Sequence, residues 1–192
     1  MKRRAIHILY LSGFGSRYDK FRLKALRLWR YKNVSIELVP MRWEGKETFE
    51  QKLVRIDRAI DRVNGKRVVI VGESAGGSMA VHIYARRPDD IQRVITICGK
   101  NSHPETVGED YFERSPAFRT TMERLNDATK LLTKNQRHEF VSIHPMYDSV
   151  VPVRETMIAG GRCKRLWTIG HGLTIALVLT VLSPLLVRIV RK

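Results

Sequence analysis

The chain contains the run VVIVGESAGG at residues 68–77, followed by SMAV at residues 78–81. Four consecutive β-branched residues predict a strand that is buried on both faces, and the residues after the glycines predict a helix. Between them, Gly72, Ser74 and Gly76 form a Gly-x-Ser-x-Gly turn. Small residues on both sides of the serine let the strand and the helix approach closely and leave the hydroxyl exposed. We interpret Ser74 as a nucleophile held on a tight strand-to-helix turn.

A plain glycine-rich turn or a phosphate cradle is the alternative interpretation of this motif. A Gly-x-Ser-x-Gly string alone arises by chance, but the flanking strand and helix make this one specific. A P-loop would also need a Lys-Ser/Thr pair after the glycines, and the chain has none there. The context therefore favours a catalytic serine.

Short apolar runs and helical segments alternate along the whole chain. Strands are predicted at residues 6–11, 34–39, 67–72, 94–98, 140–143 and 165–169, and helices at 19–31, 47–63, 75–87, 114–134 and 154–159. Such alternation is typical of right-handed βαβ units in a doubly wound, mainly parallel sheet. With 192 residues and no internal repeat, we predict an α/β fold in one domain, residues 1–192, with about six strands.

Composition excludes several classes of protein. With 43% hydrophobic and 28% charged residues, the chain is neither disordered nor fibrous. No Cys/His cluster has the spacing of a zinc site, and we predict neither a metal nor a cofactor. Cys98 and Cys163 are placed on or beside the fourth and sixth strands, roughly 9.5 Å apart by strand spacing, too far for a disulfide. We expect both to be buried free thiols.

His171 is the best candidate among six histidines for the base that Ser74 requires. It directly follows the last predicted strand, between Gly170 and Gly172, where a loop has room to move an imidazole. The acid is predicted to be Asp148, which follows the strand at 140–143 and is the only carboxylate between Glu139 and Glu155. A helix-capping or turn aspartate is the alternative role for Asp148.

The backbone N–H groups of Phe14 and Ala75 are predicted to form an oxyanion hole. The first strand leads into Ser12-Gly13-Phe14-Gly15, and the two glycines let the Phe14 amide turn toward the site beside that of Ala75. A simple turn into the next helix is the alternative.

At this point the chain resembles a small α/β-hydrolase. The order Ser74, Asp148, His171 is that family's order of nucleophile, acid and histidine. The resemblance covers essentially the whole chain but begins at the family's third strand, so it describes a trimmed version. The elbow is similar to that of carboxylesterases, whereas Ser12-Gly13-Phe14-Gly15 replaces their His-Gly-Gly type of oxyanion loop.

The resemblance also implies a helical lid. The family's insertion corresponds to residues 100–137, with a helix over 115–134. Candidates to line an acyl pocket beneath it are Phe112, Phe118, Met122 and Leu125, although core packing is the alternative for each. The resemblance implies a serine hydrolase that cleaves a small-molecule or lipid-like ester through an acyl-enzyme on Ser74. Thioester or amide cleavage uses the same groups, and an inactive basic binding module is the rival.

The net charge of +16 lies at the two ends of the chain. Residues 1–32 carry ten Lys and Arg against one acid, and residues 162–192 carry six against none. This segregation argues against nucleic acid as a partner and favours a local basic surface. On the first helix we expect a cationic stripe of Arg17, Lys20, Lys24 and Arg27, with Phe21, Ala25 and Leu28 facing inward.

Residues 173–190 are nearly all apolar and are predicted to form one helix packed on the sheet. A membrane span is possible by length, because residues 166–187 carry no charge. However, His171 must reach Ser74, so the helix should stay with the domain. We expect its outer face and the basic stripe to dock on an anionic membrane surface; burial in a homo-oligomer is the alternative.

The start of the chain lacks a signal-peptide cleavage site. We therefore expect a cytoplasmic protein, and peripheral attachment to the inner face of the membrane is a further possibility.

Overall fold

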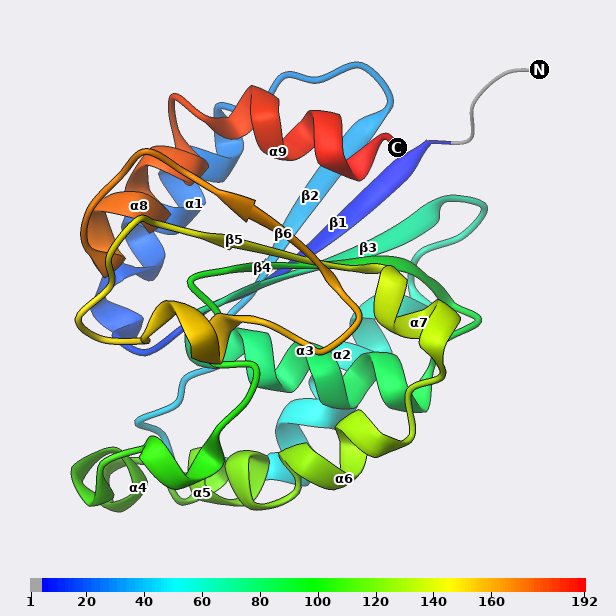
Figure 1. Cartoon of the computed structure of the whole chain (residues 1–192). Coiled ribbons are helices and arrows are strands. Elements are labelled where there is room, and N and C mark those ends of the chain that lie inside the picture. Colours follow the sequence, from blue (N-terminus) through cyan, green and yellow to red (C-terminus); the bar gives the residue numbers. More distant parts are fainter. Residues whose placement is uncertain (1–4) are drawn as a thin grey trace.

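Residues 5–192 are described by a computed structural model, and they contain a single six-stranded parallel sheet (Figure 1). The strand order is β2-β1-β3-β4-β5-β6. The strands are β1 (Ile6–Leu11), β2 (Val34–Val39), β3 (Arg67–Glu73), β4 (Ile91–Ile97), β5 (Phe140–His144) and β6 (Arg162–Arg165). The predicted α/β class and the parallel sheet are confirmed.

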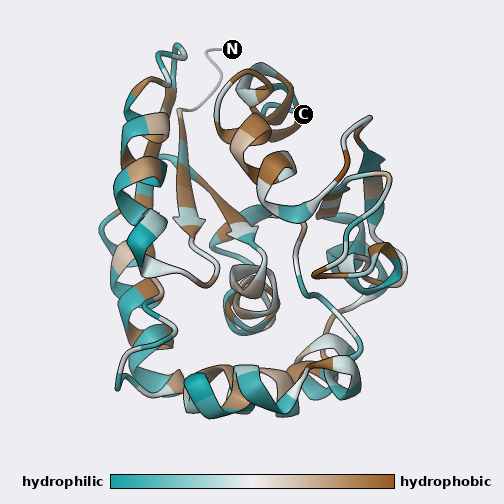
Figure 2. Ribbon diagram, turned by 90° about the vertical axis from the view of Figure 1, so that its left-hand side faces the viewer, coloured by the Kyte–Doolittle hydropathy of each residue, from teal (hydrophilic) through white to brown (hydrophobic). Residues whose placement is uncertain are grey.

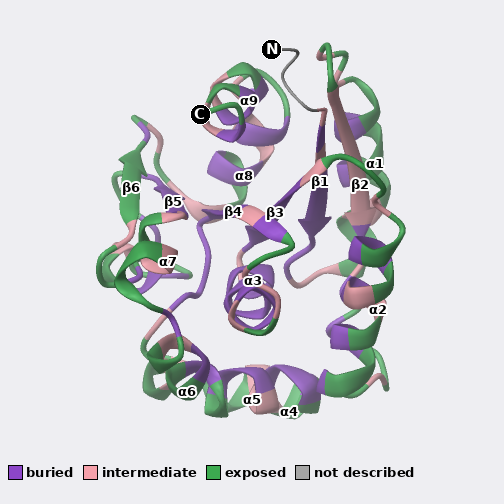
Figure 3. Ribbon diagram, turned by 90° about the vertical axis from the view of Figure 1, so that its right-hand side faces the viewer, coloured by how far each residue is buried: buried purple, intermediate pink, exposed green. Residues whose placement is uncertain are grey.

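Helices cover both faces of the sheet because its central strands are apolar on both sides. On one face lie α2 (Phe49–Asp61), α3 (Ala75–Arg86), α5 (Pro116–Glu123) and α6 (Leu125–Lys130); on the other lie α1 (Asp19–Arg27), α8 (His171–Leu179) and α9 (Ser183–Val190). Alternate residues of one strand enter opposite cores: Leu9 packs with α2 and α3, whereas Ile8 packs with α1 and α8. Helix α3, which begins at the serine, is buried almost throughout (Figure 3).

The predicted helix at 114–134 is wrong, because this segment is broken into short helices. Helix α4 (Glu109–Arg114) ends at Ser115, whose side chain caps α5 by accepting a hydrogen bond from the Phe118 amide. Pro116 then fixes the first turn of α5. After α6, Thr133 forms a capping box that starts α7 (Lys134–His138). At each of these caps the chain changes direction and a new helix begins.

The last strand lies earlier than predicted. Strand β6 has the sequence RCKR, and all four of its residues are exposed because it is the edge strand of the sheet (Figure 3). The apolar run at 165–169, which indicated a strand, forms the connection to α8; there Ile169 makes only an isolated bridge with Tyr147. Cys163 lies in β6 and is exposed, so its predicted burial is wrong, whereas Cys98 is buried. The predicted helix at 154–159 is a 3₁₀ turn, Val153–Thr156.

The predicted single helix at 173–190 is two helices, α8 and α9, whose axes differ by 72°. Thr180 leaves the helical conformation at φ −113° and ψ −99°, and Pro184 starts the new helix. Both helices are largely hydrophobic in Figure 2, and their buried side chains include Ile175, Val178, Leu179 and Leu186, which belong to the core on their face of the sheet. Within residues 5–192 no single helix reaches the length and apolarity of a membrane span; the bent α8–α9 pair does so only when its two parts are taken together.

The described parts of the two basic ends of the chain lie side by side. The Trp29 indole N–H donates to the Leu179 carbonyl at 2.9 Å, and Arg191 donates to the Lys32 carbonyl at 2.8 Å. The predicted facing of residues 17–28 is confirmed for the exposed cations Arg17, Lys20, Lys24 and Arg27 and for buried Ala25, but it is wrong for Phe21 and Leu28. Phe21 and Leu28 are exposed, whereas Arg22, Ala25 and Leu26 are the buried residues of α1. The first four residues carry three of the ten Lys and Arg counted in residues 1–32, and they lie outside the described part of the chain.

Candidate active site

The structure brings Ser74, Asp148 and His171 together at the carboxyl edge of the sheet. Ser74 follows β3, Asp148 lies in the loop after β5, and His171 begins α8. The distance from Ser74 Oγ to His171 Nε2 is 2.9 Å, and the distance from His171 Nδ1 to Asp148 Oδ2 is 2.8 Å. Three segments that are far apart in the sequence therefore form one continuous hydrogen-bonded chain.

Ser74 occupies a backbone conformation that few non-glycine residues adopt, with φ 51° and ψ −119°. Close packing around the turn maintains it. A Cβ atom on Gly72 would lie 2.8 Å from the Gly77 Cα, and one on Gly76 would lie 3.0 Å from the carbonyl carbon of Leu11. Both positions therefore require glycine, as the motif predicted, and the resulting strained turn holds the serine at the start of α3.

Asp148 is placed to orient the imidazole. Its side chain is inaccessible to solvent, and its Oδ1 accepts hydrogen bonds from the amides of Val150 at 2.9 Å and Val151 at 3.0 Å. Burial acts to raise the pKa of Asp148, but the hydrogen bonds from His171 and these amides outweigh it, so the pKa lies below its ordinary value. The ionised carboxylate therefore accepts from His171 Nδ1–H, which leaves Nε2 free to accept the Ser74 proton.

The loop after β1 lies against the serine turn. A Cβ on Gly13 would approach the Ser74 Cβ to 2.8 Å, so this loop runs directly beside Ser74. The peptide unit between Phe14 and Gly15 is held at both ends: its carbonyl accepts from Arg22 at 3.1 Å, and its N–H donates to Glu44 at 2.7 Å. Within residues 5–192 neither the Phe14 nor the Ala75 N–H donates to another group.

Aromatic side chains anchor the same loop. The Phe14 ring stacks on Trp43 at a centroid distance of 5.8 Å and meets the edges of Tyr111 and Phe118 at 5.5 and 5.1 Å. Tyr111 and Phe118 belong to the segment 100–137 that was predicted to be a lid. That segment therefore packs on the loop predicted to supply an oxyanion-hole amide, beside the pocket at Ser74.

A buried ion pair behind the serine was missed by sequence reasoning. Glu73, which immediately precedes Ser74, pairs with Arg22 of α1 and accepts the Tyr10 hydroxyl at 2.6 Å. Arg22 is 4% exposed, and all five of its N–H donors are used: two on Glu73 and one each on Asp19, Phe14 O and Gly15 O. The one available signal was an acid at the end of a strand whose centre is apolar.

Cys98 lies beside the acid and the histidine. It directly follows β4, adopts φ 50°, and has no exposed surface. Burial, then the neighbouring Asp148 carboxylate, raises the pKa of its thiol well above the ordinary range. Its Sγ lies within 4.8 Å of a carboxylate oxygen of Asp148 and a ring nitrogen of His171, three atoms of a kind that can bind a metal ion. However, Asp148 and His171 are already hydrogen-bonded to each other. The thiol is therefore an inert neighbour of the site.

Two pockets open beside Ser74. The first, about 440 Å³, is mainly apolar and lies toward α1 and α8, with Phe21, Val150, Ile175, Ala176 and Leu179 in its walls. The second, about 360 Å³, is more polar and lies toward the segment 100–137, with Lys100, Thr106, Tyr111, Phe118 and Arg154 in its walls. Of the four predicted lining residues only Phe118 is among them; Met122 and Leu125 are core residues, and Phe112 packs against that core.

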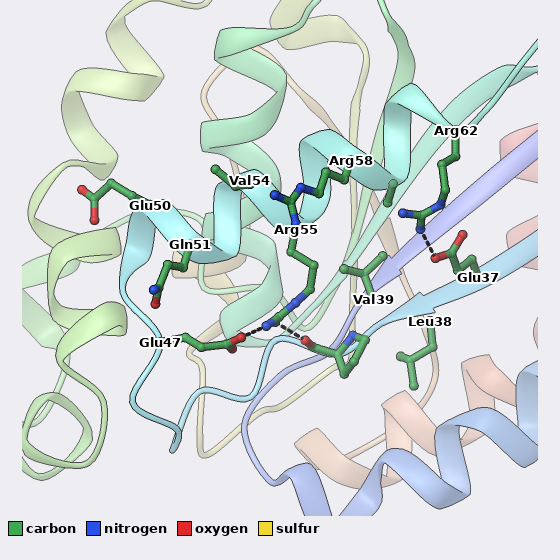
Figure 4. A pocket seen from close by; sticks show the side chains of 12 residues that line it. Glu37, Leu38, Val39, Glu47, Glu50, Gln51, Val54, Arg55, Arg58 and Arg62 are labelled. Atoms are coloured by element: carbon green, nitrogen blue, oxygen red, sulfur yellow. Dashed lines mark hydrogen bonds and ion pairs between the residues drawn. The ribbon is translucent and has the colours of Figure 1, made fainter.

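A further groove, about 620 Å³, lies between the edge strand β2 and helix α2 (Figure 4). Arg55 donates there to the Pro40 carbonyl and to Glu47, and Arg62 donates to Glu37 at 2.8 Å. Ser74, Asp148 and His171 are absent from its walls. Its charged side chains are largely paired with one another, so it does not extend the site.

Solved structures of similar shape identify the fold. Est1E from Butyrivibrio proteoclasticus matches with a TM-score of 0.64 and 14% identity over 100% of this chain and 90% of its own. A thioesterase domain from the curacin biosynthetic pathway matches with a TM-score of 0.64 and 12% identity over 96% and 91%. A hydrolase from Oleispira antarctica matches with a TM-score of 0.63 and 13% identity over 98% and 92%. Neither protein-family models nor curated protein sequences gave a match. The chain has the α/β-hydrolase fold.

Proposed function

We propose that the protein is a serine hydrolase that cleaves carboxylic esters through an acyl-enzyme on Ser74. The observation that carries this proposal is the pair of hydrogen bonds, 2.9 and 2.8 Å long, that link Ser74 to His171 and His171 to Asp148. A serine hydroxyl is a weak nucleophile at neutral pH and needs such a base, with the base oriented by a third group.

The reaction follows from these positions. His171 Nε2 takes the proton as Ser74 Oγ attacks the ester carbonyl, and Asp148 stabilises the imidazolium that forms. The amides of Phe14 and Ala75 donate to the developing oxyanion, which is a contribution of several kcal/mol in enzymes of this kind. The imidazolium then gives its proton to the departing alcohol, and a water activated by the same histidine releases the acid.

The two pockets divide the substrate between them. The mainly apolar pocket, with Phe21, Ile175 and Leu179 in its walls, suits the hydrocarbon chain of an ester. The more polar pocket, which contains Lys100 and Arg154, suits the other half of the molecule. Tyr111 lines both pockets, so the segment 100–137 would act as a lid over the site.

Labelling with a fluorophosphonate probe, followed by mass mapping of the modified residue, tests the proposal. We expect label on Ser74, no label in the Ser74→Ala variant, and loss of p-nitrophenyl ester hydrolysis in that variant. Retained hydrolysis would remove Ser74 from the mechanism. An unlabelled, folded protein would instead favour a binding module that has the fold without the activity.

Thioester cleavage is a second candidate, because one of the structurally similar proteins is a thioesterase domain. The same serine, histidine and oxyanion donors serve both reactions. Matched oxygen-ester and thioester substrates with the same acyl chain separate them, since only the leaving group differs. We expect the larger kcat/KM for the oxygen ester; a larger value for the thioester would reassign the substrate.

A further inference from the structure

Exposed apolar side chains gather on the side of the candidate site formed by the chain leaving β5 and β6. We call this group the apolar rim; its members are Met146, Tyr147, Val150, Trp167, Ile169 and Leu173. Trp167 is 82% exposed and Ile169 is 66% exposed. Large apolar residues gathered in this way on a protein surface mark an interaction site.

Backbone hydrogen bonds hold the rim in place. The chain leaving β5 and the chain leaving β6 continue side by side for a few residues past the sheet; the first then turns to the 3₁₀ turn Val153–Thr156, and the second enters α8 (Figure 1). The Met146 amide donates to the Thr168 carbonyl at 2.9 Å, and the Gly170 amide donates to the Tyr147 carbonyl at 2.9 Å. The exposure of the rim therefore belongs to an ordered surface.

The rim is continuous with the mouth of the apolar pocket. Val150 is half exposed and also lines both pockets beside Ser74. Tyr18, which directly precedes α1, and Phe21 of α1 are likewise about half exposed, and both line the apolar pocket. An apolar path therefore leads from the outer surface to the serine.

Cations lie next to the rim; of those in β6, Arg162 pairs with Glu139 at 3.8 Å, whereas no ion pair within residues 5–192 involves Lys164 or Arg165. Strand β6 presents Arg162, Lys164 and Arg165 to solvent, and the Arg165 guanidinium lies 5.6 Å from the centre of the Trp167 ring. Residues 140–192 contain seven Lys and Arg but two carboxylates, Asp148 and Glu155, and both are buried. The surface therefore favours a partner that is apolar and negatively charged.

We propose that the apolar rim and the cations of β6 dock on a lipid bilayer that contains anionic lipid, with the mouth of the apolar pocket at the bilayer surface. Tryptophan next to Lys and Arg suits the interface between headgroups and acyl chains. This surface differs from the one expected from the sequence, because many of the apolar residues of α8 and α9 face the sheet. Docking itself does not depend on the proposed function. Only its consequence, that the site would meet esters carried by the lipid, rests on the proposed function.

Sedimentation of the full-length protein with vesicles tests this surface. The vesicles are made of phosphatidylcholine alone or of phosphatidylcholine mixed with phosphatidylglycerol. We expect the protein to pellet with the mixed vesicles, less so at high salt, and at least tenfold more weakly in the double variant Trp167→Ala with Ile169→Ala. The double variant Lys164→Gln with Arg165→Gln should lose about fivefold in affinity per charge.

Control variants separate this proposal from the hydrolase proposal. Leu131→Ala removes a residue that is 71% exposed at the end of α6, outside the rim, and should leave vesicle binding unchanged. Ser74→Ala should bind vesicles like the wild type, and the Trp167/Ile169 variant should hydrolyse a soluble p-nitrophenyl ester like the wild type in vesicle-free buffer. Wild-type vesicle binding by that variant, or no binding by the wild type, would overturn the proposal. Rim-dependent dimerisation without vesicle binding would also overturn it and assign the rim to a second copy of the chain.

Discussion

The Arg22 guanidinium and the Glu73 carboxylate form a buried ion pair directly behind the turn that carries Ser74. Arg22 also donates to the carbonyls of Phe14 at 3.1 Å and Gly15 at 3.0 Å. One side chain therefore joins the loop that bears the Phe14 amide to the turn that bears Ser74. Because its five donors are all used, this connection fixes both position and orientation.

Replacement of Arg22 by methionine leaves the Glu73 charge buried without its cation. Breaking a buried pair in this way costs about 3–5 kcal/mol of unfolding free energy. We expect Arg22→Met to lower the urea midpoint accordingly. A midpoint equal to that of the wild type would show that the pair does not stabilise the fold.

The Arg22→Lys variant separates loop orientation from charge. Lysine keeps the cation but lacks the planar fork that reaches Phe14 O, Gly15 O and Glu73 together. We expect it to retain more stability than Arg22→Met while kcat falls by roughly tenfold to a hundredfold with little change in KM, because a misplaced oxyanion donor acts on the transition state. An unchanged kcat would exclude a positioning role for Arg22.

Asp148→Asn should leave the fold intact and remove most of the activity. The amide can no longer hold His171 in the tautomer that accepts the Ser74 proton, and the equivalent change in a Ser-His-Asp protease lowers kcat by about 10⁴. Steady-state kinetics with a p-nitrophenyl ester measures this effect, with circular dichroism to check the fold. Activity within a few fold of the wild type would show that Asp148 does not orient the histidine.

The pH dependence of stability should also report on Asp148, whose pKa in the folded protein is lowered from an ordinary value of 3.8. In the unfolded chain this carboxyl binds a proton at higher pH than in the folded protein. Its stabilising contribution is therefore fully present above the unfolded pKa and is lost as pH falls through the folded pKa. Urea unfolding at pH 6 and near pH 3 should show a smaller decrease for Asp148→Asn than for the wild type. Equal decreases would contradict the lowered pKa.

The two thiols should differ sharply in reactivity. Cys98 is buried and its thiol pKa is raised, first by burial and then by Asp148, whereas Cys163 is exposed on the edge strand β6. Titration of the native protein with an aromatic disulfide reagent should modify one thiol per chain. Cys163→Ser should abolish that reaction and Cys98→Ser should preserve it. Two fast thiols in the native wild type would show that Cys98 is accessible.

Five of the six strands and the three candidate side chains were predictable from sequence patterns. Buried parallel strands have continuous apolar sequences, and the chain order of Ser74, Asp148 and His171 places each side chain after a strand. Strand β6 was misplaced because an edge strand needs no apolar sequence; its RCKR run gave no hydrophobic signal. Cys163 lies in this exposed strand, which is why the prediction that it is buried was wrong.

Features that depend on tertiary contacts were not predictable. Arg22 was one of ten cations in the first 32 residues, and only the approach of α1 to Glu73 buries it. Its burial turns α1, so Phe21 is exposed at the pocket instead of facing the core. The break in the apolar segment 173–190 is different, because Pro184 was a local sign of a new helix start that the apolar composition of the segment outweighed in the prediction.

Gly13→Ala and Gly172→Ala form a matched pair that tests the close approach of the first loop to the serine. A Cβ at Gly13 would lie 2.8 Å from the Ser74 Cβ and 3.0 Å from the Glu73 carbonyl oxygen, so the loop or the serine turn must move. We expect Gly13→Ala to lose about 1–3 kcal/mol of stability by overpacking and to lower kcat. A Cβ at Gly172 meets nothing within 4 Å, and this residue lies in α8. Gly172→Ala should therefore gain up to about 1 kcal/mol through helix propensity.

Urea unfolding measures both variants, and ester hydrolysis measures the loop variant. If Gly13→Ala were as stable and as active as the wild type, the loop could not lie against Ser74, and the Phe14 amide would be too distant to donate to an oxyanion. If instead stability fell while kcat stayed constant, the loop would pack on the turn without contributing to the transition state. The 2.8 Å distance between a Cβ at Gly13 and the Ser74 Cβ requires that stability and kcat fall together.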